Sequence, residues 1–195
     1  MTKRMLRKTA TPNARPARIG RRISAGSRKA MTAKSAAMKE PAAGYGVTPL
    51  EQVRGLDGLG LMKGIMDGRF PAPPIAKALG FSMSLVEHGR VTFDYEPVFD
   101  HYNPLGSVHG GVAATLLDSV MGCCIHTTLK PGFGFTTLEI KVNYVRAMTD
   151  KTGPVRAEGK VINVGSRVAT SEGRLVDASG KLLAHGTTTC LIFSI

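Results

Sequence analysis

The spacing of apolar residues changes from a helical period to a strand period near residue 81. Within residues 48–71, apolar side chains recur every three or four positions, which predicts an amphipathic helix interrupted by glycines. The proline-rich residues 70–81 are expected to end it. Residues 81–89 and 90–97 then predict two strands joined at His88-Gly89.

Four further runs have strand character, with a turn at Gly165-Ser166 and a hairpin turn at 178–181: they are 136–144, 154–164, 166–177 and 182–193. The first alternates most clearly. Its apolar face is predicted to carry Leu138, Ile140, Val142 and Tyr144, and its polar face Thr137, Glu139, Lys141 and Asn143. The order of elements predicts an α+β fold with an antiparallel sheet of about five to six strands.

Between these two groups of strands lies one strongly apolar helix. Ten of the fourteen residues from Val112 to Ile125 are apolar, so the sheet is expected to wrap around the helix and enclose it on nearly all sides. Asp118 is the one carboxylate in this helix, and an isolated buried carboxylate is costly. Asp118 is therefore either a general base or nucleophile, or a structural residue at an exposed edge or cap.

The start of the helix is a second candidate for a role in catalysis. Asn103-Pro-Leu-Gly predicts a turn, and His109-Gly110-Gly111 follows just before the apolar run. A helix start exposes unpaired N–H groups, and glycine there lets a substrate oxygen approach the backbone. The pattern favours an oxyanion site, although tight packing alone also explains two glycines.

Helix geometry separates the two features. His109 and Asp118 are nine residues apart, about half a turn out of phase and ~13 Å along the axis. If they act together, two copies related by a twofold axis must share each site, which predicts an obligate dimer.

The net charge of +12 belongs to one end of the chain. Residues 1–40 hold 12 Lys/Arg and one acid, and the other 155 residues hold 14 Lys/Arg and 13 acids. Residues 1–47 are predicted to be a basic, disordered tail and linker, and 48–195 one domain with an N-terminal helical segment at 48–74. Three interpretations of the tail stay open. It is inert or precedes the true translation start, it targets the protein to an organelle, or it binds polyanions.

Composition also limits the chemistry. No apolar run is long enough to span a bilayer, and the three cysteines lack zinc-site spacing. The cysteines are expected to be core residues in a reducing compartment, which predicts a cytoplasmic protein unless the tail targets an organelle. Neither a membrane nor nucleic acid is expected as a partner of the domain.

Three segments together resemble the PaaI-type hotdog-fold acyl-CoA thioesterases. They are "NPLGSVHGGVAATLLDSVMG" (103–122), "TTLEIKVNYVRAM" (136–148) and "VINVGSRVATSEGRLVDASGKLLAHGTTTCLIF" (161–193). The resemblance covers roughly residues 75–193. It implies a hotdog fold, in which the sheet wraps the central helix, and homodimers that often pair into tetramers.

The resemblance also implies roles for single residues. Asp118 would be the catalytic carboxylate, and the Gly110 N–H of the partner subunit would polarise the thioester carbonyl. Asn103 would assist, and His109 would shape the turn. A hydroxyl on the next strand falls on Thr137 or its neighbour Thr136. The turn of Val164, Gly165, Ser166 and Arg167 would line the coenzyme A arm, with Gly111 also near the substrate.

The predicted reaction is hydrolysis of an acyl-CoA to a free acid and CoA. It needs a polarised carbonyl and one base, so no metal and no separate cofactor are expected. The alternatives are a hotdog enoyl-CoA hydratase or dehydratase, a non-catalytic acyl-CoA-binding protein, and a structural dimer without a ligand.

Overall fold

The computed structural model describes residues 40–195, so most of the predicted basic tail lies outside the described residues. Three short helices, α1 (Leu50–Val53), α2 (Gly58–Met66) and α3 (Pro74–Leu79), precede strands β1 (Phe81–Glu87) and β2 (Arg90–Tyr95). A 3₁₀ turn, η1 (Phe99–His101), leads to the long helix α4 (Gly110–His126). Then follow β3 (Phe133–Tyr144), the 3₁₀ turn η2 (Asp150–Thr152), β4 (Val155–Val164), β5 (Val168–Asp177) and β6 (Leu182–Ser194). No helix among the described residues is long and apolar enough to cross a membrane.

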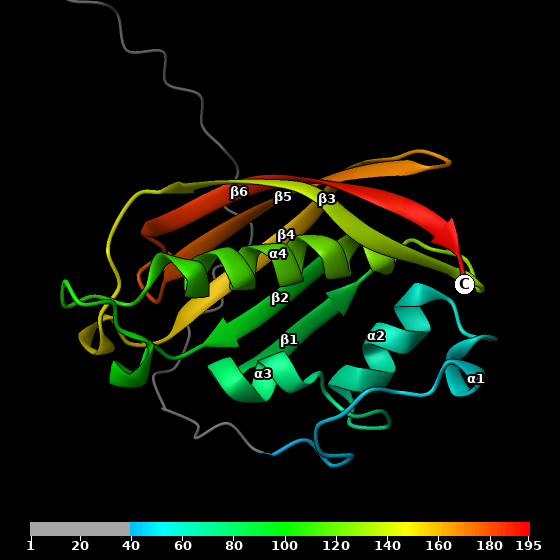
Figure 1. Cartoon of the computed structure of the whole chain (residues 1–195), viewed down its shortest axis with the longest axis horizontal. Coiled ribbons are helices and arrows are strands. Elements are labelled where there is room, and N and C mark those ends of the chain that lie inside the picture. The colour runs from blue at the N-terminus through cyan, green and yellow to red at the C-terminus, as the bar shows by residue number, and fades with distance from the viewer. Residues whose placement is uncertain (1–39) are drawn as a thin grey trace, which may run out of the picture. The chain divides into compact units, whose positions relative to one another are not determined.

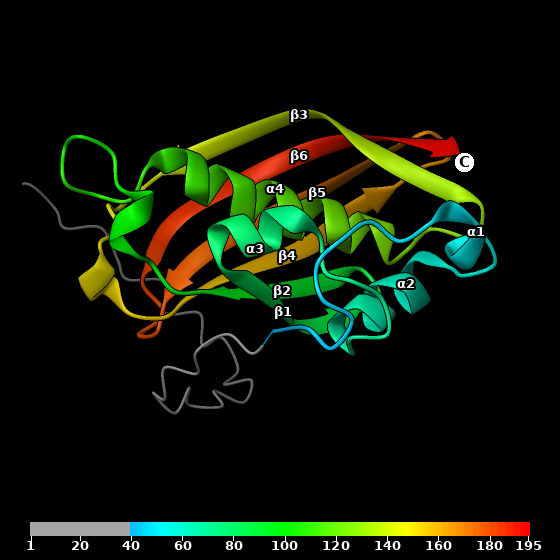
Figure 2. The same cartoon turned by 60° about the horizontal axis from the view of Figure 1, so that its bottom comes forward.

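The six strands form one antiparallel sheet in the order β1-β2-β4-β5-β6-β3. The sheet curves around α4, which lies along its concave face (Figure 1 and Figure 2). The predicted hotdog fold is therefore confirmed. Both β1 and β3 are edge strands, and no other strand of the described residues pairs with the outer side of β3.

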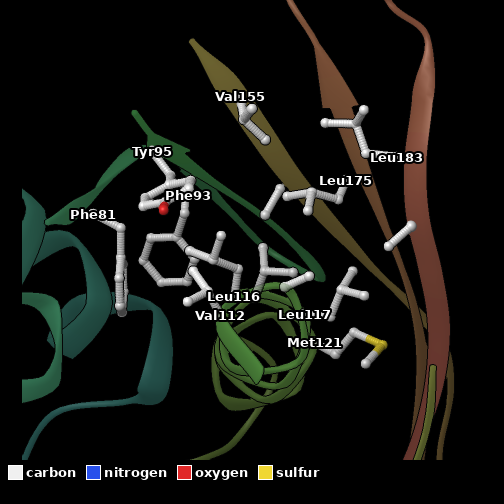
Figure 3. Packing of buried hydrophobic residues seen from close by; sticks show 14 of the residues in the cluster. Phe81, Phe93, Tyr95, Val112, Leu116, Leu117, Met121, Val155, Leu175 and Leu183 are labelled. Carbon is white, nitrogen blue, oxygen red and sulfur yellow. The ribbon is translucent and has the colours of Figure 1, made fainter. Parts of the chain in front are cut away.

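The core fills the space between α4 and the sheet. Val112, Leu116, Leu117 and Met121 point from the helix towards the strands in Figure 3. Leu116 and Leu117 are fully buried. Burial of side chains of this size stabilises the fold by about 1.5–3 kcal/mol each.

A row of glycines allows α4 to lie close to the sheet. Gly159, Gly173 and Gly186 stand side by side on β4, β5 and β6. A Cβ on Gly159 would lie 2.5 Å from the carbonyl oxygen of Val120 in α4, and a Cβ on Gly173 would lie 2.8 Å from Cγ of Met121. The backbone of α4 therefore occupies the space that a Cβ would need at Gly159, and side chains of α4 occupy it at Gly173.

The N-terminal part differs from the single helix predicted for residues 48–71. α1 and α2 are separate helices, because Asp57 takes an extended conformation and caps α2 by accepting a hydrogen bond from the Gly60 N–H at 2.7 Å. The proline-rich segment also forms a helix, α3, which has proline at its first position and ends at Gly80 with a φ of 63°. In the described part of the predicted tail and linker, Tyr45 forms a parallel bridge with Ala72.

Candidate active site

Asp118 lies on a stripe of α4 that the sheet leaves uncovered. Nine of the seventeen α4 residues are buried, whereas Asp118, Ser119, Thr115 and His126 are only half-buried. The prediction that the helix is enclosed on nearly all sides is therefore wrong for the single chain, because one sheet covers one side of a helix. The carboxylate is accessible rather than isolated in the core.

Thr137 holds the Asp118 carboxylate. Its Oγ1 donates a hydrogen bond of 2.9 Å to Oδ1 of Asp118 and lies 4.0 Å from Sγ of Cys190. Within residues 40–195, no side chain or backbone N–H donates a hydrogen bond to Oδ2 of Asp118. That oxygen is thus available to a water molecule or a substrate.

A bulge in β3 points Thr137 at the helix. The pairing of β3 with β6 skips one residue between Thr137 and Glu139, so Leu138 is left out of register and is 58% exposed. The predicted alternation is therefore wrong at Leu138. Because of the extra residue, Thr137 shares the helix-facing side of β3 with Ile140 and Val142, rather than the opposite side.

The start of α4 presents a free backbone donor. His109 is the N-cap, and its Nδ1 accepts a hydrogen bond of 2.9 Å from the Gly111 N–H. The Gly110 N–H donates to no acceptor among the described residues. A Cβ on Gly110 would lie only 3.2 Å from the Tyr144 ring, so this position has little room for a side chain.

Asn103 is engaged within its own turn. Its Oδ1 accepts hydrogen bonds from the N–H groups of Leu105 at 2.9 Å and Ser107 at 3.3 Å, and its Nδ2 donates to Oγ of Ser107 at 3.1 Å. Asn103 thus fixes the loop before the helix. It also lines a cavity of about 290 Å³ together with Gly110, Tyr144 and Met148.

The catalytic candidates of one chain fall into two separate groups. Asp118 and Thr137 meet at the middle of α4, whereas His109, Gly110 and Asn103 gather at its start. Asp118 does not line the 290 Å³ cavity. The fold therefore keeps apart the carboxylate and the N–H donor that the sequence analysis assigned to different subunits.

The residues predicted for the coenzyme A arm lie elsewhere on the sheet. Val164, Gly165, Ser166 and Arg167 form the exposed turn between β4 and β5, closed by a hydrogen bond of 2.8 Å from the Gly165 N–H to the Val168 carbonyl. Thr136 is exposed and pairs with Leu191, which pairs with Val168 beside this turn. Thr136 thus lies near the turn, whereas Thr137 contacts Asp118. Gly111 is exposed on the uncovered stripe of α4.

The sequence analysis did not find a pair of residues behind the helix start. The hydroxyl of Tyr95, a buried residue of β2, hydrogen-bonds Nδ1 of His101 at 2.9 Å. The His101 carbonyl in turn accepts the N–H of His109 at 2.8 Å. In the sequence, Tyr95 and His101 are six positions apart, and neither helical nor strand periodicity brings residues at that spacing together.

Several groups near the site have shifted acid–base properties. Burial, together with the charges of Cys124 and Asp118, raises the pKa of the Cys123 thiol to about 12. Burial also lowers the pKa of His126, whose Nδ1 has no hydrogen-bond partner among the described residues. Cys123, Cys124 and Cys190 are free thiols, and no group of metal-ligating side chains exists within residues 40–195.

The structure thus combines the hotdog fold with two features of α4. The Asp118 carboxylate is accessible on the helix, and the Gly110 N–H is a free donor at the helix start. The thioesterase superfamily matches residues 105–184, which contain both features. A protein of Halobacterium salinarum that is named an esterase is 33% identical to this chain over 99 residues. The match covers 48% of this chain and 64% of that protein. The chain thus spans just under two thirds of that relative.

Three more comparisons agree. The 1,4-dihydroxy-2-naphthoyl-CoA hydrolase of Listeria monocytogenes is 24% identical over 60% of this chain and 94% of its own length. A phenylacetic acid degradation-related protein of Ralstonia eutropha is 29% identical, with a TM-score of 0.61 over 67% of this chain and 98% of its own. A Streptococcus mutans protein bound to acetyl-CoA is 25% identical, with a TM-score of 0.54 over 58% of this chain and 89% of its own.

Over residues 105–184 the chain therefore matches the thioesterase superfamily. These similarities support the predicted family, PaaI-type hotdog thioesterases, and the predicted enzyme class, thioester hydrolase.

Proposed function

We propose that the protein is an acyl-CoA thioesterase that hydrolyses a coenzyme A thioester to a free acid and CoA. The observation that carries the proposal is the Asp118 carboxylate, accessible on α4 and held at one oxygen by Thr137. The hydrolase name of the Listeria relative and the acetyl-CoA bound to the Streptococcus protein support the substrate class.

The chemistry requires a base or nucleophile on one side of the carbonyl and a donor on the other. The free Oδ2 of Asp118 takes a proton from water or attacks the carbonyl carbon itself. The Gly110 N–H, at the positive end of α4, stabilises the developing oxyanion. Because one chain keeps these groups apart, each site takes Asp118 from one subunit and Gly110 from the other. The turn 164–167 offers Arg167 to the CoA phosphates.

A thiol-release assay across an acyl-CoA panel tests the proposal. We expect Asp118→Asn to fold normally and to lower kcat by roughly 10²–10⁴-fold. Thr137→Val is expected to lower kcat by about 10- to 100-fold, because it removes a hydrogen bond to a charged group. Asp100→Asn, at an exposed aspartate on η1, is the matched control and is expected to keep wild-type turnover. Undiminished thiol release by Asp118→Asn would refute the assignment.

Single-turnover hydrolysis in ¹⁸O-water separates the two roles of Asp118. If Asp118 is a general base, the acid formed in the first turnover carries the label. If it is a nucleophile and water then attacks the aspartyl carbon, that acid carries an unlabelled oxygen from the enzyme.

A further inference from the structure

An apolar cavity of about 770 Å³ lies outside the residues matched to the thioesterase superfamily, except at one point. Met62 and Ile65 of α2 form one wall, and Phe81, Met83 and Phe93 of β1 and β2 form another. Cys123 of α4 is the one lining residue that lies within the matched segment. We call this space the N-terminal cavity. Its volume falls within the range typical of small-molecule sites, ~300–1,000 Å³.

Residues 40–48 line one side of the cavity, and the fold fastens this segment in place. The N–H of Gly46 donates to the Ala72 carbonyl at 2.9 Å, and the N–H of Ala72 donates to the Gly44 carbonyl at 3.0 Å. Nζ of Lys77 in α3 lies 5.6 Å from the centre of the Tyr45 ring, a cation–π contact. In Figure 2, residues 41–48 cross in front of α4 between α3 and α2. The cavity is thus a built space and not a gap beside a loose end.

The charged side chains that line the cavity disfavour an anionic occupant. Glu40 and Asp67 are the only ionised side chains among the described residues that line it, and both are acidic. A carboxylate or phosphate inside would lose its hydration and meet like charges. An uncharged hydrocarbon instead gains free energy by leaving water.

Cys123 connects the cavity to the site. It lies five residues beyond Asp118 on α4, about 7.5 Å further along the helix axis. The Asp118 charge contributes to the raised pKa of the Cys123 thiol, so the two side chains are within electrostatic reach. Between them on the helix surface lies Ser119, which is half-buried, whereas Gly122 is buried under the ring of Phe135, so the route from the carboxylate to the cavity passes over Ser119.

We propose that the N-terminal cavity binds the hydrocarbon end of the acyl group, so that the preferred substrates are acyl-CoAs of medium or long chain. This inference rests on the proposed thioesterase function. It locates chain-length selection in residues 40–83, Phe93 and Cys123 of a single chain rather than in the helix start and carboxylate that perform the chemistry.

Selectivity should therefore rise with chain length. A short acyl group ends before the cavity, whereas each further methylene buried there raises kcat/KM by up to about fourfold. The rise stops when the cavity is full. An enzyme without this subsite would show no such slope.

A single-tryptophan reporter tests the cavity directly, because the chain contains no tryptophan. Met66 lines the cavity and is 37% exposed, so Met66→Trp places the indole at its wall. Ile75, which is 46% exposed on α3 and does not line the cavity, gives the matched control Ile75→Trp. Both variants are made in full-length protein that also carries Asp118→Asn to prevent turnover.

Dodecanoyl-CoA is expected to shift the emission of the Met66→Trp variant to shorter wavelength, since the hydrocarbon chain displaces water from around the indole. CoA alone should not shift it. The emission of the Ile75→Trp variant should respond to neither ligand.

Turnover gives the second measurement. With Asp118 intact, Met66→Trp is expected to lower the ratio of kcat/KM for dodecanoyl-CoA to that for butyryl-CoA by about tenfold or more, since the indole occupies the cavity. Ile75→Trp should leave the ratio unchanged. An unresponsive Met66→Trp indole together with an unchanged ratio would overturn the inference while wild-type thiol release still upheld the thioesterase function.

Two other outcomes are also decisive. If no acyl-CoA is hydrolysed by the wild type, the thioesterase function fails, and a shift of the Met66→Trp emission with 1-dodecanol would show that the cavity still binds hydrocarbon. If that emission shifts with protein concentration and not with ligand, a second copy of the chain fills the cavity and the inference is overturned.

Discussion

At the scale of single residues, the site depends on residues that do not react themselves but orient the groups that do. Thr137 fixes Asp118, and the Tyr95–His101 pair lies behind the turn that carries Gly110. Burial raises the pKa of Tyr95 to about 12, so its phenol stays neutral at physiological pH. Such residues are positioning groups, and their substitution should affect kcat more than KM.

Tyr95→Phe should loosen the turn at the start of α4. We expect the free energy of unfolding to fall by about 1 kcal/mol, because one largely buried hydrogen bond is lost. We also expect kcat for thioester hydrolysis to fall several-fold with KM nearly unchanged. Tyr102→Phe is the control: its hydroxyl is in the same loop but bonds Asp150, at 2.8 Å. Equal losses of kcat in both variants would contradict a positioning role for Tyr95.

His126 should make stability dependent on pH. Burial holds its folded-state pKa below the ordinary value of 6.5, so the unfolded chain binds the proton more readily. The free energy of unfolding is therefore expected to fall as the pH drops below 6.5, and to level off below the folded-state pKa. Urea unfolding between about pH 8 and pH 5 measures this slope. His126→Gln should reduce the slope, and an identical slope in the variant would show that other groups cause it.

At the scale of elements, long-range pairing decides what the local pattern leaves open. The strands, their turns and α4 were predictable, because alternation and helical periodicity depend on neighbours in the chain. The bulge at Leu138 was not, since it appears only when β3 is paired with β6. The glycine row also escaped prediction, because Gly159, Gly173 and Gly186 align only in the folded register.

The glycine row gives a graded stability test. Gly159→Ala places its Cβ against the Val120 carbonyl, part of the α4 backbone, and is expected to cost about 2–3 kcal/mol of unfolding free energy. Gly173→Ala meets the flexible side chains of Met121 and Leu117, and should cost about 1 kcal/mol. Chemical denaturation of both variants measures the difference. A larger loss for Gly173→Ala would show that the side chains, not the helix backbone, limit the approach of α4.

At the scale of the whole molecule, the uncovered stripe of α4 and the edge strand β3 are the surfaces available for the dimer that the proposed function requires. The proposed function needs Asp118 of one chain beside Gly110 of another, and a composite site can be tested by mixing inactive chains. Gly110→Pro removes the donor N–H at a helix position that accepts proline, and Gly110→Ala is its control, since it adds a Cβ but keeps the N–H.

Co-refolded Asp118→Asn and Gly110→Pro chains should regain activity. Each variant alone is expected to be nearly inactive, whereas a hybrid dimer contains one site with both groups intact. With random pairing, half of the dimers are hybrids, so about a quarter of the wild-type thiol release should return. Gly110→Ala should retain more activity than Gly110→Pro. Mixed chains that stay inactive would show that one chain supplies both groups.

The sequence by itself determined the strands, the central helix, the carboxylate in that helix, the glycines at its start and the family resemblance, because these depend on local spacing and residue type. Tertiary structure alone decided the partner of the carboxylate, Thr137, through a one-residue bulge that turns its hydroxyl towards α4. It also decided how closely the helix meets the sheet, and that the N-terminal segments enclose a cavity. Those features arise from the register between distant segments, which no local pattern encodes.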